Sequence, residues 1–244
     1  MPRFFVTEEA KIGDTVKICG SDALHIARSL RMAVGDGVTV CLGDGDEHFC
    51  TLTSIHDDEC IARVDSTRPS PAESPRHITL YMAYPKGDKL ETVVQKAVEL
   101  GVCRVVPFES ERCIKRPAPE KAAKNTARLL RIAEEAAKQC GRAILPEVGM
   151  PISFAELLDR IATHAVTLFC YEGEGALSLR AVLEEGIGDG DIAVIVGSEG
   201  GFSPSEADRI SARGAKCVNL GPRILRCETA PDYILSAISY RFEL

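Results

Sequence analysis

The chain has 244 residues, of which 45% are hydrophobic, and its formal net charge is −7. It contains no apolar run near the roughly 20 residues that a membrane-spanning helix needs, and its first residues lack a basic segment followed by an apolar stretch. We therefore expect a cytoplasmic protein of one or two domains, since domains commonly span about 100 to 200 residues.

The ten cysteines are scattered along the chain, and no two of them form a Cys-x-x-Cys pair. Because the chain has ample apolar material for a core, reduced and mostly buried thiols are favoured over disulfides or a metal site. Charge is unevenly distributed, because residues 77–146 carry 13 basic and 8 acidic side chains while both flanking regions are acidic. This basic middle region suits either an RNA-facing surface or a solvated helix face with ion pairs.

The first part of the chain, residues 1–72, predicts a small β-barrel domain. Short apolar stretches alternate there with Gly and Asp turns, at residues 3–6, 15–18, 37–42, 49–55 and 60–64. Residues 22–32 are an exception, because their apolar spacing predicts a short helix that brings His25 close to Arg28. Residues 66–76 contain three prolines without a periodic apolar pattern, which predicts an extended connection.

The second part, residues 73–244, alternates strands with helices. Strands are predicted at residues 78–83, 104–108, 165–171, 192–196 and 217–220, and helices at 88–100, about 119–140 and 232–242. Asp88 with Glu91 predicts one helix cap, and Ser153 with Glu156 predicts another. Repeated strand and helix units indicate an α/β domain with a mainly parallel sheet.

A glycine-rich turn at residues 197–201 follows the buried strand at 192–196. Ser203, Pro204 and Glu206 then fix the start of a helix tightly. Glycines let the backbone turn sharply and approach a ligand, and ligands of open α/β sheets lie beyond the carboxyl ends of strands. The alternative is a tight turn that merely needs positive φ. The turn is neither a dinucleotide fingerprint nor a Walker A loop.

A second segment of interest follows the strand at 217–220. It places Arg223, Arg226, Glu228 and Thr229 between a buried strand and an apolar helix. Because a buried charge needs an ion-pair partner or a role in binding or catalysis, this group of side chains indicates a functional site. An internal ion pair between Glu228 and Arg226 is the structural alternative.

Together the two segments resemble a known signature. The run Gly-Ser-Glu-Gly-Gly-Phe-Ser at 197–203 and the run Leu-Gly-Pro-Arg-Ile-Leu-Arg-Cys-Glu-Thr-Ala at 220–230 resemble the small-subunit ribosomal RNA (uridine N3) methyltransferases, the RsmE family of the SPOUT, or trefoil-knot, superfamily. Further similar segments lie in family order at residues 1–5, 25–31, 86–101 and 134–146. Two departures stand out: Ser198 replaces the usual Pro, and Cys227 replaces the usual Thr.

The resemblance implies a PUA-like barrel that helps to hold RNA, followed by a knotted α/β domain that binds S-adenosylmethionine. It also implies a homodimer, with the final helix against a second copy. The cofactor would lie among three loops, with candidate binding residues Phe169, Tyr171, Glu172, Val196, Gly197, Glu199, Gly200, Gly201, Leu220, Gly221, Ile224 and Leu225.

Methyl transfer from a sulfonium is an in-line displacement that needs no metal, and it relies largely on positioning. Uridine N3 must lose its proton, so a cation near the base favours the resulting anion. We expect Arg226 or Arg223 to stabilise that anion, and Glu199 or Glu228 to orient the base or take the proton.

The expected partner is 16S ribosomal RNA, with the target uridine unpaired or turned out of its helix. Candidate phosphate contacts are Arg3, Arg28, Arg31, Lys86, Lys89, Lys115, Arg116, Lys121, Lys124, Arg128, Arg131 and Arg142. For His25, two roles stay as alternatives: contact with RNA and local packing. Two rival functions are a knotted tRNA 2′-O-methyltransferase and a ribosome assembly factor without catalysis.

Overall fold

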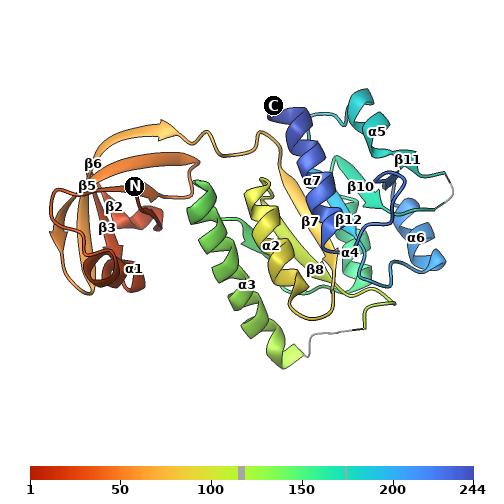
Figure 1. The fold of residues 1–244 in the computed structure, drawn as a ribbon, viewed down its shortest axis with the longest axis horizontal. Coiled ribbons are helices and arrows are strands. Elements are labelled where there is room, and N and C mark those ends of the chain that lie inside the picture. Colours follow the sequence, from red (N-terminus) through yellow and green to blue (C-terminus); the bar gives the residue numbers. More distant parts are fainter. Residues whose placement is uncertain (115–118, 174) are drawn as a thin grey trace. The chain divides into compact units, whose positions relative to one another are not determined.

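The structure is a computed structural model that describes all residues except 115–118 and 174. The predicted phosphate contacts Lys115 and Arg116 therefore lie outside the described residues. The chain forms two compact units, one of residues 1–73 with 137–145 and one of residues 74–136 with 146–244 (Figure 1). The sequence predicts a domain boundary between residues 72 and 73. In the structure, the separate segment 137–145 also belongs to the first unit.

The first unit is built on a six-stranded sheet in the order β1-β4-β5-β6-β3-β2. Only β1 and β4 pair in parallel; the other neighbours are antiparallel. Its core lies on one face because side chains alternate, as Val16 and Ile18 of β3 show. The strands are β1 (Arg3–Phe5), β2 (Lys11–Ile12), β3 (Thr15–Cys19), β4 (Gly37–Cys41), β5 (Asp46–Ile55) and β6 (Glu59–Pro69), with a 3-10 turn η1 (Glu8–Ala10).

The helix expected at 22–32 is shorter and irregular. It is α1 (Ser21–Leu24), which continues as the π-helical η2 (His25–Ser29). The backbone N–H of Leu30 donates to His25 O, five residues back, at 2.9 Å. Arg31 then takes the left-handed region with φ 51°. Ala23 and Ile26 enter the core, whereas Leu24 and Leu30 are 43% and 40% exposed, so the residues expected on the apolar face are not the ones that are buried.

The predicted connection 66–76 was wrong in its first residues, because β6 extends to Pro69. In the long β5–β6 hairpin, Asp46 lies opposite Pro69. Arg68 holds this end of the hairpin, with an ion pair to Glu47 at 3.0 Å and its guanidinium over the Phe49 ring. Pro is tolerated at the end of a strand, where no further ladder bond is needed.

The second unit contains a seven-stranded, wholly parallel sheet in the order β11-β13-β10-β12-β7-β8-β9. Every residue of β7 and β12 is buried, as expected for strands covered on both faces. The strands are β7 (Ile78–Ala83), β8 (Arg104–Phe108), β9 (Glu147–Val148), β10 (Val166–Cys170), β11 (Leu177–Ser178), β12 (Ile192–Val196) and β13 (Lys216–Asn219). The predicted fold class, a mainly parallel α/β unit preceded by a small β unit, is confirmed.

The helices of this unit are α2 (Lys89–Glu99), α4 (Phe154–Ile161), α5 (Leu179–Glu185), α6 (Pro204–Ser211), α7 (Thr229–Phe242) and most of α3 (Pro119–Cys140). The last residues of α3, 137–140, belong to the first unit. Helices α2 and α7 pack side by side (Figure 1). The last helix begins three residues earlier than expected, since Pro231 is tolerated in a first turn. Within the described part of the chain, no helix is both long and apolar enough to cross a bilayer.

Two of the three predicted helix caps form. The capping boxes Ser153/Glu156 and Ser203/Glu206 are both formed. Asp88 precedes α2, but its side chain makes no capping bond because its backbone is not extended (φ −101°, ψ 12°). All ten cysteines lie in the described residues and are free thiols, and only Cys19 is exposed.

Candidate cofactor site

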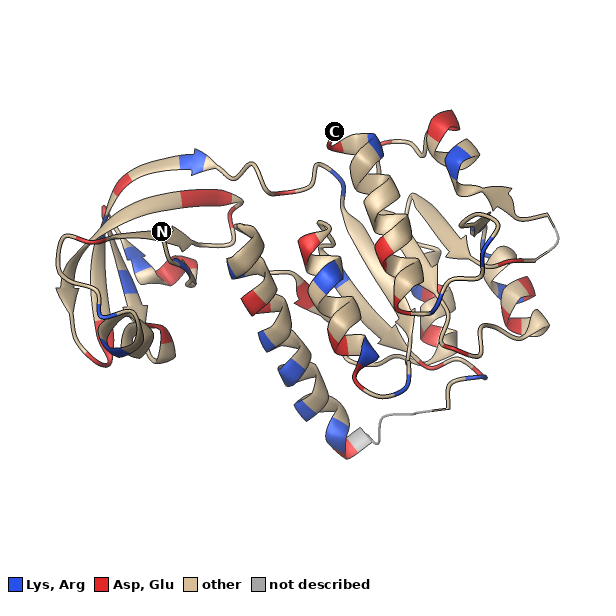
Figure 2. Ribbon diagram, in the orientation of Figure 1, with Lys and Arg blue, Asp and Glu red and all other residues tan. Residues whose placement is uncertain are grey.

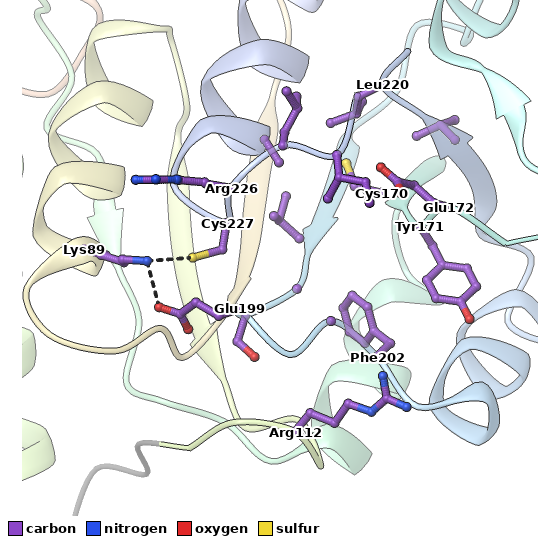
Figure 3. Close-up of a pocket in the computed structure, with 18 residues that line it drawn as sticks. Lys89, Arg112, Cys170, Tyr171, Glu172, Glu199, Phe202, Leu220, Arg226 and Cys227 are labelled. Atoms are coloured by element: carbon purple, nitrogen blue, oxygen red, sulfur yellow. Dashed lines mark hydrogen bonds and ion pairs between the residues drawn. The ribbon is translucent and has the colours of Figure 1, made fainter. Parts of the chain in front are cut away.

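A cavity of about 640 Å³ lies beyond the carboxyl ends of β10, β12 and β13 (Figure 3). The glycine turn 197–201 and the bend at 220–227 form parts of its wall, so the structure brings the two predicted segments together. Its lining consists of Lys89, Arg112, Cys170, Tyr171, Glu172, Val196, Gly197, Ser198, Glu199, Gly201, Phe202, Val218, Leu220, Ile224, Leu225, Arg226, Cys227 and Ala230.

Close packing requires glycine in the turn. A Cβ on Gly200 would lie 2.9 Å from Arg112 Cβ and 3.0 Å from Arg112 O, and one on Gly197 would lie 2.9 Å from the Phe202 ring. Gly201 has φ +62° but faces open space. Gly197 and Gly201 line the cavity, whereas Gly200 lies against Arg112 instead. The turn is therefore shaped by its neighbours as well as by its own backbone.

A buried carboxylate joins this turn to the loop after β8. Glu206 is 5% exposed, and its Oε1 accepts a hydrogen bond of 2.7 Å from the Glu111 backbone N–H. Its Oε2 accepts one of 3.0 Å from the Ser203 N–H, within the capping box. Next to it, Arg112 Nη1 donates to Gly200 O at 3.2 Å. Glu206 thus fixes α6 and the β8 loop together behind the cavity.

Phe169 is fully buried and does not line the cavity, although it was a candidate cofactor residue. It stacks on Tyr171 with ring centroids 5.3 Å apart and meets Phe202 edge to face at 4.9 Å. Tyr171 and Phe202 do line the cavity. Phe169 therefore supports the aromatic wall from behind.

Lys89 lies at the centre of a charged cluster on one side of the cavity. Its Nζ is 3.0 Å from Glu199 Oε1 and 3.1 Å from Glu228 Oε2. Hydrogen bonds to Glu199 and Glu228 raise the pKa of Lys89. Burial alone would raise the pKa of both carboxyl groups, but hydrogen bonds from backbone amides and from Lys89 outweigh it and lower the pKa of each. All three groups are therefore charged at neutral pH.

Cys227 lies beside this cluster. Its thiol donates to Glu228 Oε2 at 3.2 Å, and burial together with that hydrogen bond raises the pKa of Cys227 to about 12. The side chain is thus a neutral hydrogen-bond donor, as the usual Thr hydroxyl would be.

The two arginines of the bend are exposed, contrary to the expectation that they would be buried. Glu228 pairs with Lys89, so the alternative ion pair between Glu228 and Arg226 is not found in the described structure. Arg226 lines the cavity. Arg223 and Gly221 instead line an adjacent hollow of about 280 Å³, which shares Glu172 and Ile224 with the main cavity.

Several predicted RNA contacts have partners inside the first unit. Arg142 is 2% exposed and pairs with Glu73 at 2.9 Å, and Arg3 pairs with Glu47 at 2.5 Å. Both observations argue against phosphate contact by these two side chains. Arg28 is exposed but forms an ion pair with Asp57, and His25 and Arg31 are exposed on the same irregular segment.

In the second unit, Lys86 is exposed, and its backbone N–H donates to the Glu199 carboxylate at 3.1 Å. Lys89, predicted to contact RNA, is directed into the cavity cluster instead. Sequence reasoning also missed lining residues that lie at or after strand ends, above all Arg112. The rule that ligands lie beyond the carboxyl ends of strands could have found Arg112, since it follows β8.

A family model described as an RNA methyltransferase domain matches residues 72–239, and one described as an RNA methyltransferase PUA domain matches residues 18–65. The chain is therefore an RNA methyltransferase. The chain is 36% identical to the ribosomal RNA small subunit methyltransferase E of Bacillus subtilis, over 100% of this chain and 98% of the relative. The chain belongs to the ribosomal RNA small subunit methyltransferase E family.

Two solved structures agree with this assignment. A ribosomal RNA small subunit methyltransferase E from Neisseria gonorrhoeae, bound to S-adenosyl methionine, is 33% identical with a TM-score of 0.87, covering 98% of this chain and 97% of that one. A Legionella pneumophila protein, solved with its bound cofactor SAM, is 32% identical with a TM-score of 0.85, covering 98% and 96%.

Proposed function

We propose that this protein transfers a methyl group from S-adenosylmethionine to N3 of a uridine in 16S ribosomal RNA. It acts in the cytoplasm, as a homodimer, on the small ribosomal subunit. The observation that carries the proposal is that the glycine turn 197–201 and the bend 220–227 meet in one cavity at the carboxyl ends of three strands.

The residues of the cavity fit the proposed cofactor. Its volume of about 640 Å³ lies within the range of small-molecule pockets, and its wall combines apolar side chains with a few polar groups. Glu199 and Glu228 contribute two carboxylates on the side that Lys89 occupies, which gives that cluster one net negative charge. Such a charge suits a cationic sulfonium donor, which supplies the methyl group when bound.

Arg226 is our candidate for stabilising the uridine anion. It lines the cavity and is exposed, and no hydrogen bond or ion pair joins its guanidinium to another described residue. A guanidinium without a protein partner keeps its charge and its N–H donors available for an anion that develops on the substrate. Arg223 lies at the adjacent hollow and is the weaker candidate.

Glu199 and Glu228 are better suited to orientation than to proton uptake. Both pKa values lie below the ordinary value for a glutamate, and both carboxylates already accept hydrogen bonds from Lys89. A general base works best when its pKa lies near the operating pH, which argues against these two groups. We therefore assign them a role in positioning.

A row of basic side chains on α3 is our candidate phosphate surface. Lys121, Lys124, Arg128 and Arg131 recur at a spacing of three to four residues, and all four are exposed. They lie along α3, the helix with the row of blue segments in Figure 2. Of the four, Arg128 pairs with Glu91 at 2.8 Å. Phosphate contacts by such a row would make RNA binding fall steeply with salt.

The homodimer is proposed from the exposed face of α7. Tyr233 and Tyr240, seven residues apart, are 46% and 74% exposed, and Leu244 follows at 96%. Tyrosines at a helical spacing of two turns form one stripe, and aromatic side chains are enriched at protein interfaces. A second copy of this chain is the occupant that the family resemblance indicates.

The test is nucleoside analysis of small subunits treated with the purified protein and labelled donor. We expect 3-methyluridine in 16S RNA from assembled subunits, and less of it from naked RNA. A methyl group on a ribose hydroxyl would assign the protein to the 2′-O-methyltransferases instead. Donor binding by calorimetry without any methylated nucleoside would favour an assembly factor.

A further inference from the structure

We propose that Lys89 is a positioning residue that clamps the two walls of the cofactor cavity to each other through Glu199 and Glu228. Glu199 belongs to the glycine turn, and Glu228 directly follows the bend. The proposal rests on the assignment of this cavity to S-adenosylmethionine. It replaces the prediction that Lys89 contacts RNA.

The geometry of the ammonium group supports this role. Lys89 Nζ has three donor hydrogens, and it lies 3.0 Å from Glu199 Oε1, 3.1 Å from Glu228 Oε2 and 3.9 Å from Cys227 Sγ. Figure 3 shows the Lys89 side chain pointing at Glu199 and Cys227. An ammonium group engaged in this way has little capacity left for a phosphate.

The fold places Lys89 next to both walls of the cavity. It is the first residue of α2, which packs beside α7, and α7 begins one residue after Glu228. From the other side, the backbone N–H of Lys86 donates to both carboxylate oxygens of Glu199, at 3.1 and 3.3 Å. Lys86, in the loop before α2, and Lys89, at its first residue, therefore both bind Glu199, and Lys89 also binds Glu228.

The positive charge of Lys89 separates two negative charges, those of Glu199 and Glu228. Two carboxylates share one ammonium, so removal of Lys89 would leave Glu199 and Glu228 to repel each other across the junction of the two walls. Their separation would widen the cavity. If Lys89 acted only through its charge, its removal would instead favour a cationic donor over a neutral product.

The experiment compares binding of the cationic donor S-adenosylmethionine and the neutral product S-adenosylhomocysteine by calorimetry. We expect Lys89→Met to raise both dissociation constants, that of the neutral product by about tenfold or more, since a tenfold change is the size of one lost interaction. The rise for the donor should be smaller, because the two unpaired carboxylates attract its positive charge. Amide hydrogen exchange should rise at 197–201 and at 226–229 together.

Lys96→Met is the matched control. Lys96 also lies on α2 and joins it to α7 through an ion pair of 2.8 Å with Asp232, but it does not line the cavity. We expect it to change neither dissociation constant nor the exchange of the two walls. Circular dichroism checks that both variants are folded. Should Lys89→Met not fold, Glu228→Gln is the second variant. It should raise amide hydrogen exchange more at 226–229 than at 197–201.

Three results would overturn the proposal. One is unchanged binding of donor and product in Lys89→Met. Another is tighter binding of the donor alone, which would show an effect of charge without positioning. The third is a loss of RNA affinity with both walls unchanged in hydrogen exchange. Wild-type protein that fails to bind the donor at all would instead reject the assignment of the cavity itself.

Discussion

The two walls of the cavity differ in how firmly the protein holds them. The glycine turn 197–201 is fixed from several sides, by Lys86 and Lys89 at Glu199 and by Arg112 at Gly200. The bend is held at its end, where Glu228 meets Lys89, while the middle of it is exposed. Ile224 there is 87% exposed although it is apolar.

This difference indicates that the two walls have different roles. The rigid wall is preorganised, which reduces the ordering cost of binding a cofactor. The open wall carries Arg223, Ile224 and Arg226, whose side chains remain available to RNA or to a second subunit.

The largest effect is expected behind the rigid wall, at Glu206. Glu206→Ala removes a buried carboxylate that accepts two backbone hydrogen bonds, and it should lower the free energy of unfolding by about 3 to 4 kcal/mol, because a hydrogen bond to a charged group contributes about 1.5 to 3 kcal/mol. Urea denaturation measures this change. Glu156→Ala is the control, since it disrupts an equivalent but exposed capping box and should cost about 1 kcal/mol. Equal losses in both variants would contradict the importance of burial.

On the open wall, Arg226→Ala should lower the single-turnover rate of methylation about 100-fold, the usual size for loss of one group that stabilises a developing anion. Donor affinity should change little, because the side chain is not tied to the rigid wall. Arg223→Ala should have a smaller effect, since Arg223 faces the adjacent hollow. An unaltered rate in Arg226→Ala, with the donor still bound, would reject its role.

Gly200→Ala tests how closely the rigid wall is packed. The added Cβ would lie 2.9 Å from Arg112 Cβ and 3.0 Å from Arg112 O, and such overpacking costs about 1 to 3 kcal/mol. We expect donor affinity to fall about 10- to 30-fold by calorimetry. Gly201→Ala meets no atom within 4 Å and should cost about 1 kcal/mol of stability through its positive φ alone. A larger loss of stability in Gly201→Ala than in Gly200→Ala would argue against packing as the cause.

The smallest effect concerns pH. The pKa of Glu199 and of Glu228 is lowered in the folded protein, so their contribution to stability is present above the ordinary value of 4.5 and is lost as pH falls through the folded values. Lys89→Met removes one cause of that lowering. The stability difference between wild type and Lys89→Met should therefore be larger at pH 7 than at pH 3.5, as denaturation at the two values measures. A difference that is larger at pH 3.5 would contradict the ion pairs as its source.

Much of the α/β unit could be predicted from the sequence. Strands β8 and β12 have the residues expected, and the boxes Ser153/Glu156 and Ser203/Glu206 both form. These features depend on apolar periodicity and on hydrogen bonds within three or four residues, which short segments encode by themselves. The glycine turn and the bend were recognised from their residue types, since glycines and charged side chains directly follow buried strands there.

The partners of the charged side chains at the cavity were decided by the tertiary structure. Lys89 meets Glu199 and Glu228, which are more than a hundred residues away along the chain, because β7 lies beside β12 and α2 beside α7. Arg3 and Arg142 were read as RNA contacts, yet their ion pairs are within the first unit. Composition fixes how many charges a surface must accommodate, whereas strand order and helix packing determine which of them meet, since an ion pair depends on separation in space and not along the chain.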